Sequence, residues 1–530
     1  MLAARQGCLL PVEEAVATIS DTAAGQKLRM PLITASIFLD FRVPNATTWF
    51  YLSLVLAIGL FFRFNRLFSL RNWDLLGLFL LVPALLFLRE SQEIRHAEDA
   101  RLNQEAAVAF GRSMETLTLA ALSPNGPAAG ALVCGMEART LGEVSTARAA
   151  DAEHRVWLAY LFLMIGSAYY MARCIIDLTI VRRPVFIPNL NASGLAWLGL
   201  TLLVVLSVRT LLPPAEPVPV AKNQSAVLEK AADAAALAAE RVNLTVAPQR
   251  YLRPSFWVKG AIAIACHVLV VIGLVWTGAR HFHNTAAGVA AAVLYLLLPY
   301  TGYHVKEIHH AFPAALLAIS IACYRWPTVA GLLLGLASAM AYFPLLLFPL
   351  WFGFYRRAGA SRFTLAFVGV LAVLAAYLLL DPSVHPELYA ALSLPDWRAW
   401  DLSARPTGEG LWTGVEVHYA YRVPLFIGYL ALMVTTMFWP SPKNLAHLIA
   451  LSAALILGVQ FWYADAGGIY VLWYLPLLVL VYLRPNLSER FAPPINPRTD
   501  WLFHLLRWIR RTAPSPAKPL AATALRNGAQ

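Results

Sequence analysis

The feature that most constrains this chain is a run of apolar spans joined by very short links, residues 284–354. Three or four spans follow one another there, with only a few residues between them. Such links leave no room for a soluble domain, so adjacent spans must be antiparallel neighbours. In a bilayer, helices are the segments of this length that satisfy their own backbone hydrogen bonds. The stretch therefore predicts a bundle of packed membrane helices.

The composition extends this expectation to the whole chain. Of its 530 residues, 59% are hydrophobic and 14% are charged, whereas a soluble domain carries about 25% charged residues. The net charge of +12 is compatible with nucleic-acid binding. However, the lysines and arginines lie in short links and in the C-terminal tail, as in membrane proteins with positive cytoplasmic loops. We expect a lipid bilayer as partner, no nucleic acid, and a multi-pass protein of a bacterial plasma (inner) membrane.

The predicted fold class is all-α, a polytopic transmembrane helical bundle of about 12–13 spans with extracytoplasmic loop helices. The tail segment 500–511 combines Trp and Leu with three arginines and is typical of a helix that lies in the membrane interface. The expected organisation is an N-terminal segment (1–44), a transmembrane domain (45–484, with outer loops 89–155, 213–255 and 381–421) and a basic cytoplasmic tail (485–530).

The orientation of the chain depends on residues 328–354. Basic links and acidic loops fall on opposite sides only if this segment crosses twice, as two short helices that meet near Ala341 and Tyr342. Pro344 and Pro349 favour such a break, while a single continuous helix would reverse every loop before it. In the same segment, Gly331 and Gly335 are spaced to let a neighbouring helix approach closely.

The order of these segments carries a family resemblance. An apolar helix ending in Leu-Leu-Leu-Pro, a polar link, a second helix, a basic turn and then AGLLLGLA and YFPLLLFPL resemble the GT-C membrane glycosyltransferases. The likeness is to the mannosyltransferase-like branch that uses polyprenyl-phosphate sugars, and it covers roughly residues 70–380. The chain departs from the family pattern at Ala341, where the family usually has Lys. It also departs in the link 303–310, which has histidines and Glu307 in place of Asp.

The resemblance implies a function and a catalytic residue. A sugar would pass from a polyprenyl-phosphate donor to a glycan, lipid or protein acceptor on the extracytoplasmic side, with inversion. The first outer loop would supply a carboxylate general base, which is Asp99 here, with Glu98 as second choice. Arg95 and Arg101 are candidates for contact with the donor phosphate. The other interpretation of this segment is a solvated helix with pairs such as Glu98 and Arg101.

A second group of candidate residues lies in the polar link. Glu307 and His310 are three residues apart, so on a helix they share a face and could hold a divalent metal with a further ligand. Together with His304 and His309 they could instead bind a polar substrate such as phosphate, or cap the flanking helices. No metal ligand is assigned from the sequence, and any cofactor is limited to a divalent cation such as Mg or Mn.

A third group lies in the loop 381–421. Trp397 offers a ring face for a sugar, and Asp401 offers hydrogen-bond acceptors for its hydroxyls. Tryptophan is also common at membrane interfaces without any ligand. His267, within a span, is expected to be a hydrogen-bonded core histidine, and Cys174, Cys266 and Cys323 are expected to be buried small apolar residues.

Two classes of function therefore stay open. The carboxylate-rich loops favour a membrane glycosyltransferase. Ala341 at the position of the family Lys favours a non-enzymatic membrane transporter or flippase, or a catalytically degenerate scaffold protein of the same fold.

Overall fold

The computed structural model describes residues 46–122, 129–180, 187–211, 254–380, 402, 405–406, 409–414, 416–463 and 466–492. The N-terminal segment, the predicted interfacial helix 500–511 and most of the loops 213–255 and 381–421 lie outside these ranges. The described residues are nearly all helical and contain no strand, only an isolated bridge between Asn444 and Phe491. The all-α expectation is therefore confirmed for this part of the chain.

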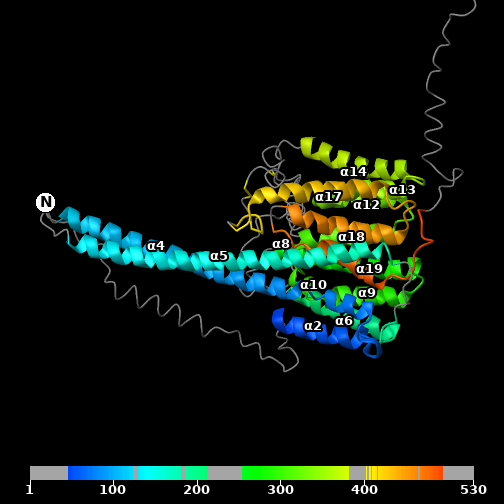
Figure 1. Ribbon diagram of the computed structural model, residues 1–530, viewed down its shortest axis with the longest axis horizontal. Coiled ribbons are helices and arrows are strands. Elements are labelled where there is room, and N and C mark those ends of the chain that lie inside the picture. The colour runs from blue at the N-terminus through cyan, green and yellow to red at the C-terminus, as the bar shows by residue number, and fades with distance from the viewer. Residues whose placement is uncertain are drawn as a thin grey trace, which may run out of the picture. The chain divides into compact units, whose positions relative to one another are not determined.

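Each predicted span coincides with helical structure (Figure 1). Proline or glycine marks several of the boundaries, for example Pro299 and Pro327 in the first turn of their helices, where the missing N–H costs nothing. The main helices are α2 (Ala46–Phe61), α3 (Leu70–Gly77), α4 (Val82–Leu122), α5 (Ala129–Asp177), α6 (Ala192–Leu211), α8 (Pro254–Trp276), α9 (Thr285–Leu297), α10 (Pro299–Tyr303), α11 (Ile308–Ala322), α12 (Pro327–Met340), α13 (Phe348–Tyr355), α14 (Ala360–Leu380), α17 (Arg422–Phe438), α18 (Leu445–Trp462) and α19 (Val471–Leu483).

Several of these helices have the length and composition of membrane spans. Among the described residues, five helical stretches are long and apolar enough to cross a bilayer: Ala150–Asp177, Ala192–Leu211, Trp257–His281, Tyr419–Phe438 and Leu445–Trp462. Shorter apolar helices precede, separate and follow them in the chain. Nearly every residue of α18 and α19 is buried, whereas α6 and α17 expose Val204, Val208, Ile427 and Val434. Apolar side chains on the outer surface fit a protein surrounded by lipid.

The predicted loop 89–155 is helical wherever it is described. α4 continues through residue 122 and α5 begins at residue 129, and the two lie side by side and extend past the other helices (Figure 1). Ala, Glu, Arg and Leu, which favour helix, dominate this segment. Pairs four residues apart, Arg89 with Glu93 at 2.8 Å and Asp151 with Arg155 at 3.0 Å, add support of the ordinary i,i+4 kind.

The segment 328–354 runs out and back, as the hairpin prediction requires. α12 begins just after Tyr324 and ends at Met340, and Ala341 has extended backbone. At this turn, Tyr342 stacks on Tyr463 with ring centroids 4.8 Å apart. The 3₁₀ turn Phe343–Leu347 and α13 then return, so that the Tyr355 hydroxyl donates to the carbonyl of Tyr324. Two short helical segments therefore replace one straight span.

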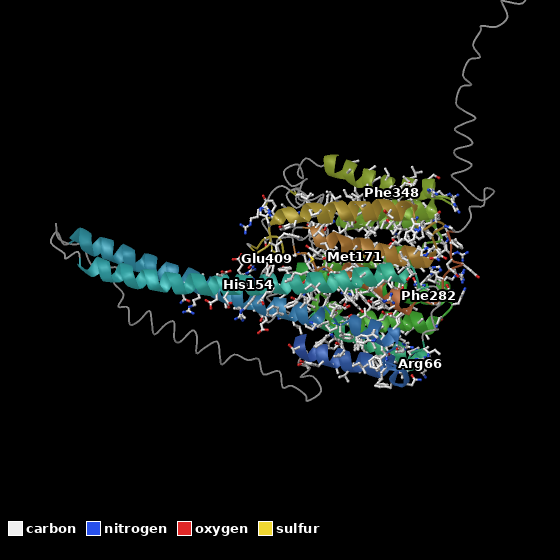
Figure 2. All side chains as sticks on the ribbon, in the orientation of Figure 1. Arg66, His154, Met171, Phe282, Phe348 and Glu409 are labelled. Carbon is white, nitrogen blue, oxygen red and sulfur yellow. The ribbon has the colours of Figure 1, made fainter. Side chains whose placement is uncertain are left out.

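The bundle has two chemically different ends, which α5 connects. At one end His154 contacts Glu416, while at the other Asp177 contacts Arg484. His154 and Asp177 are 23 positions apart on α5, which covers about 35 Å. Figure 2 shows His154 and Glu409 together, away from Arg66 and Phe282. We call these the Glu416 end and the Arg484 end.

Parts of the two acidic loops meet at the Glu416 end. Gln92 donates to Glu409 at 2.8 Å, Arg95 forms an ion pair with the same carboxylate, and Trp157 donates to the carbonyl of Leu411. Gln92 and Arg95 of the first loop therefore lie next to Glu409 of the second. Their extracytoplasmic location stays a prediction.

Candidate functional site

The link between α9 and α11 has a defined local structure. Leu298 is extended, as expected for a residue before proline, and α10 then forms a single turn that ends at Tyr303. Glu307 occupies the N-cap position of α11, yet its side chain makes no capping hydrogen bond. The side chain of Glu307 therefore does not cap the helix, because its carboxylate is turned toward histidines instead.

The carboxylate of Glu307 holds two imidazoles at one oxygen. Its Oε2 lies 2.8 Å from Nδ1 of His304 and 3.1 Å from Nε2 of His310. The rings of His304 and His310 are stacked, with centroids 4.3 Å apart. His309 is more distant, with its Nε2 3.8 Å from the same oxygen. We call His304, Glu307 and His310 the His–Glu–His cluster.

Aromatic side chains from α19 and its preceding loop form a wall behind the cluster. His310 stacks on Tyr470 at 5.3 Å, and Tyr470 stacks on Trp473 at 4.0 Å. The indole N–H of Trp473 donates to the carbonyl of His309 at 3.1 Å, which fixes the first turn of α11. The wall leaves the two imidazoles only 2% and 3% exposed, while Glu307 keeps 39% of its side chain exposed. Access to the cluster is therefore from the carboxylate side.

Burial and charge act in opposite directions on Glu307. Burial raises the pKa of its carboxyl group, but the contacts with His304 and His310 outweigh burial and hold that pKa well below its ordinary value. The carboxylate is consequently ionised at neutral pH. The outer ring nitrogens, Nε2 of His304 and Nδ1 of His310, are buried and have no hydrogen-bond partner among the described residues. Both rings thus direct their polar contacts inward to the same oxygen.

A narrow apolar slot adjoins this cluster through Tyr303. Its ring meets the ring of His304 edge-on at 4.7 Å, and burial with the charge of Glu307 raises the pKa of Tyr303 to about 12. The indole N–H of Trp49 in the slot is buried without a partner among the described residues. The lining comprises Trp49, Val82, Leu85, Leu86, Arg209, Pro299, Tyr300 and Tyr303.

Cations gather near the slot. Arg209 lines it, and Lys306 and Arg89 are close enough to interact electrostatically with Arg209. Burial, and then the charge of Arg209, lower the pKa of Lys306. Arg209 places positive charge beside the apolar lining of the slot, and Lys306 is the residue before Glu307 of the cluster. Such a pattern suits an anion carried on an apolar chain.

The residues expected to act as the general base lie elsewhere on α4. Asp99 is exposed and Glu98 is half-buried, and neither lines the slot. Arg101 is also exposed. The role of Asp99 therefore stays a prediction.

Arg95 lies in an ion pair. Its guanidinium pairs with Glu409, and Gln92 donates to the other oxygen of that carboxylate. A guanidinium has five N–H donors, and contact of Arg95 with a donor phosphate stays a prediction. The sequence could not show the contact of Arg95 with Glu409, since the two residues are 314 positions apart.

The third group of candidates is only partly described. Trp397 and Asp401 lie outside the described residues. Trp412 of the same loop is buried, and its indole N–H donates to the carbonyl of Phe461 at 3.0 Å, so its ring is not available to stack on a sugar. His267 is confirmed as a hydrogen-bonded core histidine, with its Nδ1 2.8 Å from the hydroxyl of Tyr295.

Sequence reasoning missed the polar core at the Arg484 end. Asp74 receives two hydrogen bonds from Arg173, at 2.6 and 2.7 Å, and Asp177 joins Arg173 to Arg484. All four side chains are buried. The one local signal was Arg173 and Asp177, four residues apart on an otherwise apolar span.

Comparisons with protein-family models, curated proteins and solved structures find no match for this chain.

Proposed function

We propose that this protein is a multi-pass transferase of a bacterial inner membrane that takes a sugar from a lipid-linked phosphate at the Glu416 end. The apolar helices suit a membrane location, and the sequence resemblance to GT-C enzymes suggests a sugar as the transferred group. The reaction centre in this proposal is the His–Glu–His cluster.

The observation that carries the proposal is the position of Tyr303. Its side chain lines the slot together with Arg209, and the next residue in the chain is His304 of the cluster. A phosphate bound by the cations near the slot would therefore lie on the side of Tyr303, whose hydroxyl group interacts electrostatically with the Glu307 carboxylate. The slot itself is about 20 Å³, close to the size of one water molecule. The lipid chain would instead lie on the exposed apolar faces of α2 and α6.

The chemistry follows from this placement. An acceptor hydroxyl attacks the anomeric carbon while the bond from that carbon to the phosphate oxygen breaks. The lipid phosphate leaves with the bonding electrons, and its negative charge is stabilised by Arg209 and Lys306. The hydroxyl proton passes to a base in the cluster. Glu307 follows the slot residue Tyr303 by four positions, whereas Asp99 does not line the slot, so the cluster is our candidate for this step.

A binding experiment tests the proposal. The full chain in lipid nanodiscs should bind a radiolabelled polyprenyl-phosphate sugar, and Arg209→Gln should weaken this binding at least about tenfold, since one charge-assisted contact is lost. Arg155→Gln is the matched control, because Arg155 is an exposed partner of Asp151. Equal binding by wild type and Arg209→Gln would contradict the assigned phosphate position. No binding by the wild type would favour a scaffold protein.

A further inference from the structure

We infer that the His–Glu–His cluster is a binding site for a divalent transition metal, with Zn²⁺ as the best-fitting ion. The inference does not depend on the transfer reaction, because it concerns the ligands themselves. They are Nδ1 of His304, a carboxylate oxygen of Glu307 and Nε2 of His310.

The distances between these atoms suit a single ion. One ligand atom from each residue lies within 4.8 Å of the other two, and the contacts of Oε2 with the two nitrogens are 2.8 and 3.1 Å. Zinc bonds of about 2.0–2.2 Å in a tetrahedral arrangement separate the ligand atoms by about 3.3–3.5 Å. The two contacts with Oε2 would therefore have to lengthen by about 0.2–0.7 Å.

The ring nitrogens also fit a metal site. The near nitrogens of both imidazoles converge on Glu307, and the outer nitrogens have no hydrogen-bond partner among the described residues. Glu307 accepts from both near nitrogens in the free cluster, so metal binding would require the proton of each ring to move to its outer nitrogen. Stacking places the two rings side by side, with His310 also against Tyr470, and both rings would have to turn for their in-plane lone pairs to meet one ion.

The donor set decides which metal fits best. Two imidazoles and one carboxylate are typical zinc ligands, and three protein ligands leave a fourth position for water or substrate. Magnesium prefers six oxygen ligands in an octahedron, so the Mg expected as one option from the sequence fits these residues less well. The exposed part of Glu307 marks the side from which the fourth ligand would enter.

The segment itself explains how the site forms. His304 follows α10, Glu307 precedes α11 and His310 lies in the first turn of α11. The chain turns between the two helices, so these side chains, each three residues from the next, lie close together. A regular helix would separate His304 and His310 by six residues, which is about 9 Å along the axis. The break between α10 and α11 brings the two rings into contact instead.

Metal analysis of the tag-free full chain tests the inference without any lipid substrate. The protein is stripped with a chelator in detergent, dialysed against micromolar Zn²⁺ and measured by atomic emission. About one zinc per chain is expected. Co²⁺ in its place should give the strong visible absorption of a tetrahedral site. Glu307→Gln keeps the shape of the side chain. Removal of a residue that only orients a metal ligand lowers affinity about 10–100-fold. Because Glu307 would itself be a ligand, this variant should lower zinc affinity by more than that.

Matched variants separate ligands from neighbours. His310→Ala should lose the metal, but it also removes packing against the aromatic wall, so Glu307→Gln is the decisive variant. His309→Ala should keep zinc, because its Nε2 is 3.8 Å from the carboxylate and outside the three-ligand set. The inference is overturned if wild type holds no saturable zinc, if Glu307→Gln binds zinc as wild type does, or if His309→Ala loses it. None of these results bears on donor binding, which is measured separately.

Discussion

Gly331 of α12 lies directly against the backbone carbonyl of Phe363 in α14. A Cβ atom at Gly331 would stand 2.3 Å from that oxygen, and one at Gly335 would stand 2.9 Å from the carbonyl oxygen of Phe367. The two helices therefore pack backbone to backbone through glycines spaced four residues apart. This is the arrangement by which membrane helices associate closely when lipid supplies no hydrophobic driving force.

Gly331→Ala should destabilise the protein by about 1–3 kcal/mol, because the added methyl group overpacks a helix contact that has no flexible side chain to yield. Thermal unfolding in detergent measures the effect. Gly369→Ala on α14 is the control, since no atom lies within 4 Å of a Cβ there. It should stabilise the helix by about 0.5–1 kcal/mol. Similar effects of both variants would contradict the close packing.

Asp177→Asn should cost about 3–5 kcal/mol, because it leaves the buried Arg484 without its carboxylate. Arg173 keeps Asp74 in this variant, so the loss is concentrated on Arg484. Asp151→Asn removes a carboxylate from an exposed pair with Arg155 and should change stability little. Unfolding measured on both variants tests this difference, and equal losses would show that burial does not determine the cost.

The two ends of the bundle should face opposite sides of the membrane. Single cysteines at Glu98 and Glu416, both at the Glu416 end, should react with an impermeant maleimide from the extracytoplasmic side. A cysteine at Arg357 should react only after the membrane is opened, as positive cytoplasmic links predict. Labelling of position 357 and protection of position 416 in intact cells would reverse the orientation.

The sequence predicted the helices well because apolar length and glycine spacing are local signals. The break near Ala341 followed from Pro344 and the charge pattern, and Gly331 and Gly335 were assigned their packing role from spacing alone. Contacts between distant segments carry no such signal. Arg484 follows Asp177 by 307 residues, and Trp473 reaches the carbonyl of His309 across 164 residues. The buried ionic core and the aromatic wall could therefore not be predicted.

The candidate site was predicted by residue but not by arrangement. The density of titratable groups in the link marked His304, Glu307, His309 and His310, and left metal binding, substrate binding and capping open. The choice among them depends on the direction of the Glu307 side chain, which a sequence does not specify. Asp99 was preferred because of its place in a family pattern. The exposure of its side chain is known only from the fold.

The central claim is that the His–Glu–His cluster, and not the α4 carboxylate Asp99, is the reaction centre. The most direct test is sugar release from a labelled polyprenyl-phosphate donor by the full chain in nanodiscs. Wild type, Glu307→Gln and Asp99→Asn are compared at saturating donor. We expect Glu307→Gln to lower the rate by at least about 100-fold with folding and donor binding retained, while Asp99→Asn stays within a few-fold of wild type. A large loss in Asp99→Asn with Glu307→Gln fully active would contradict the account.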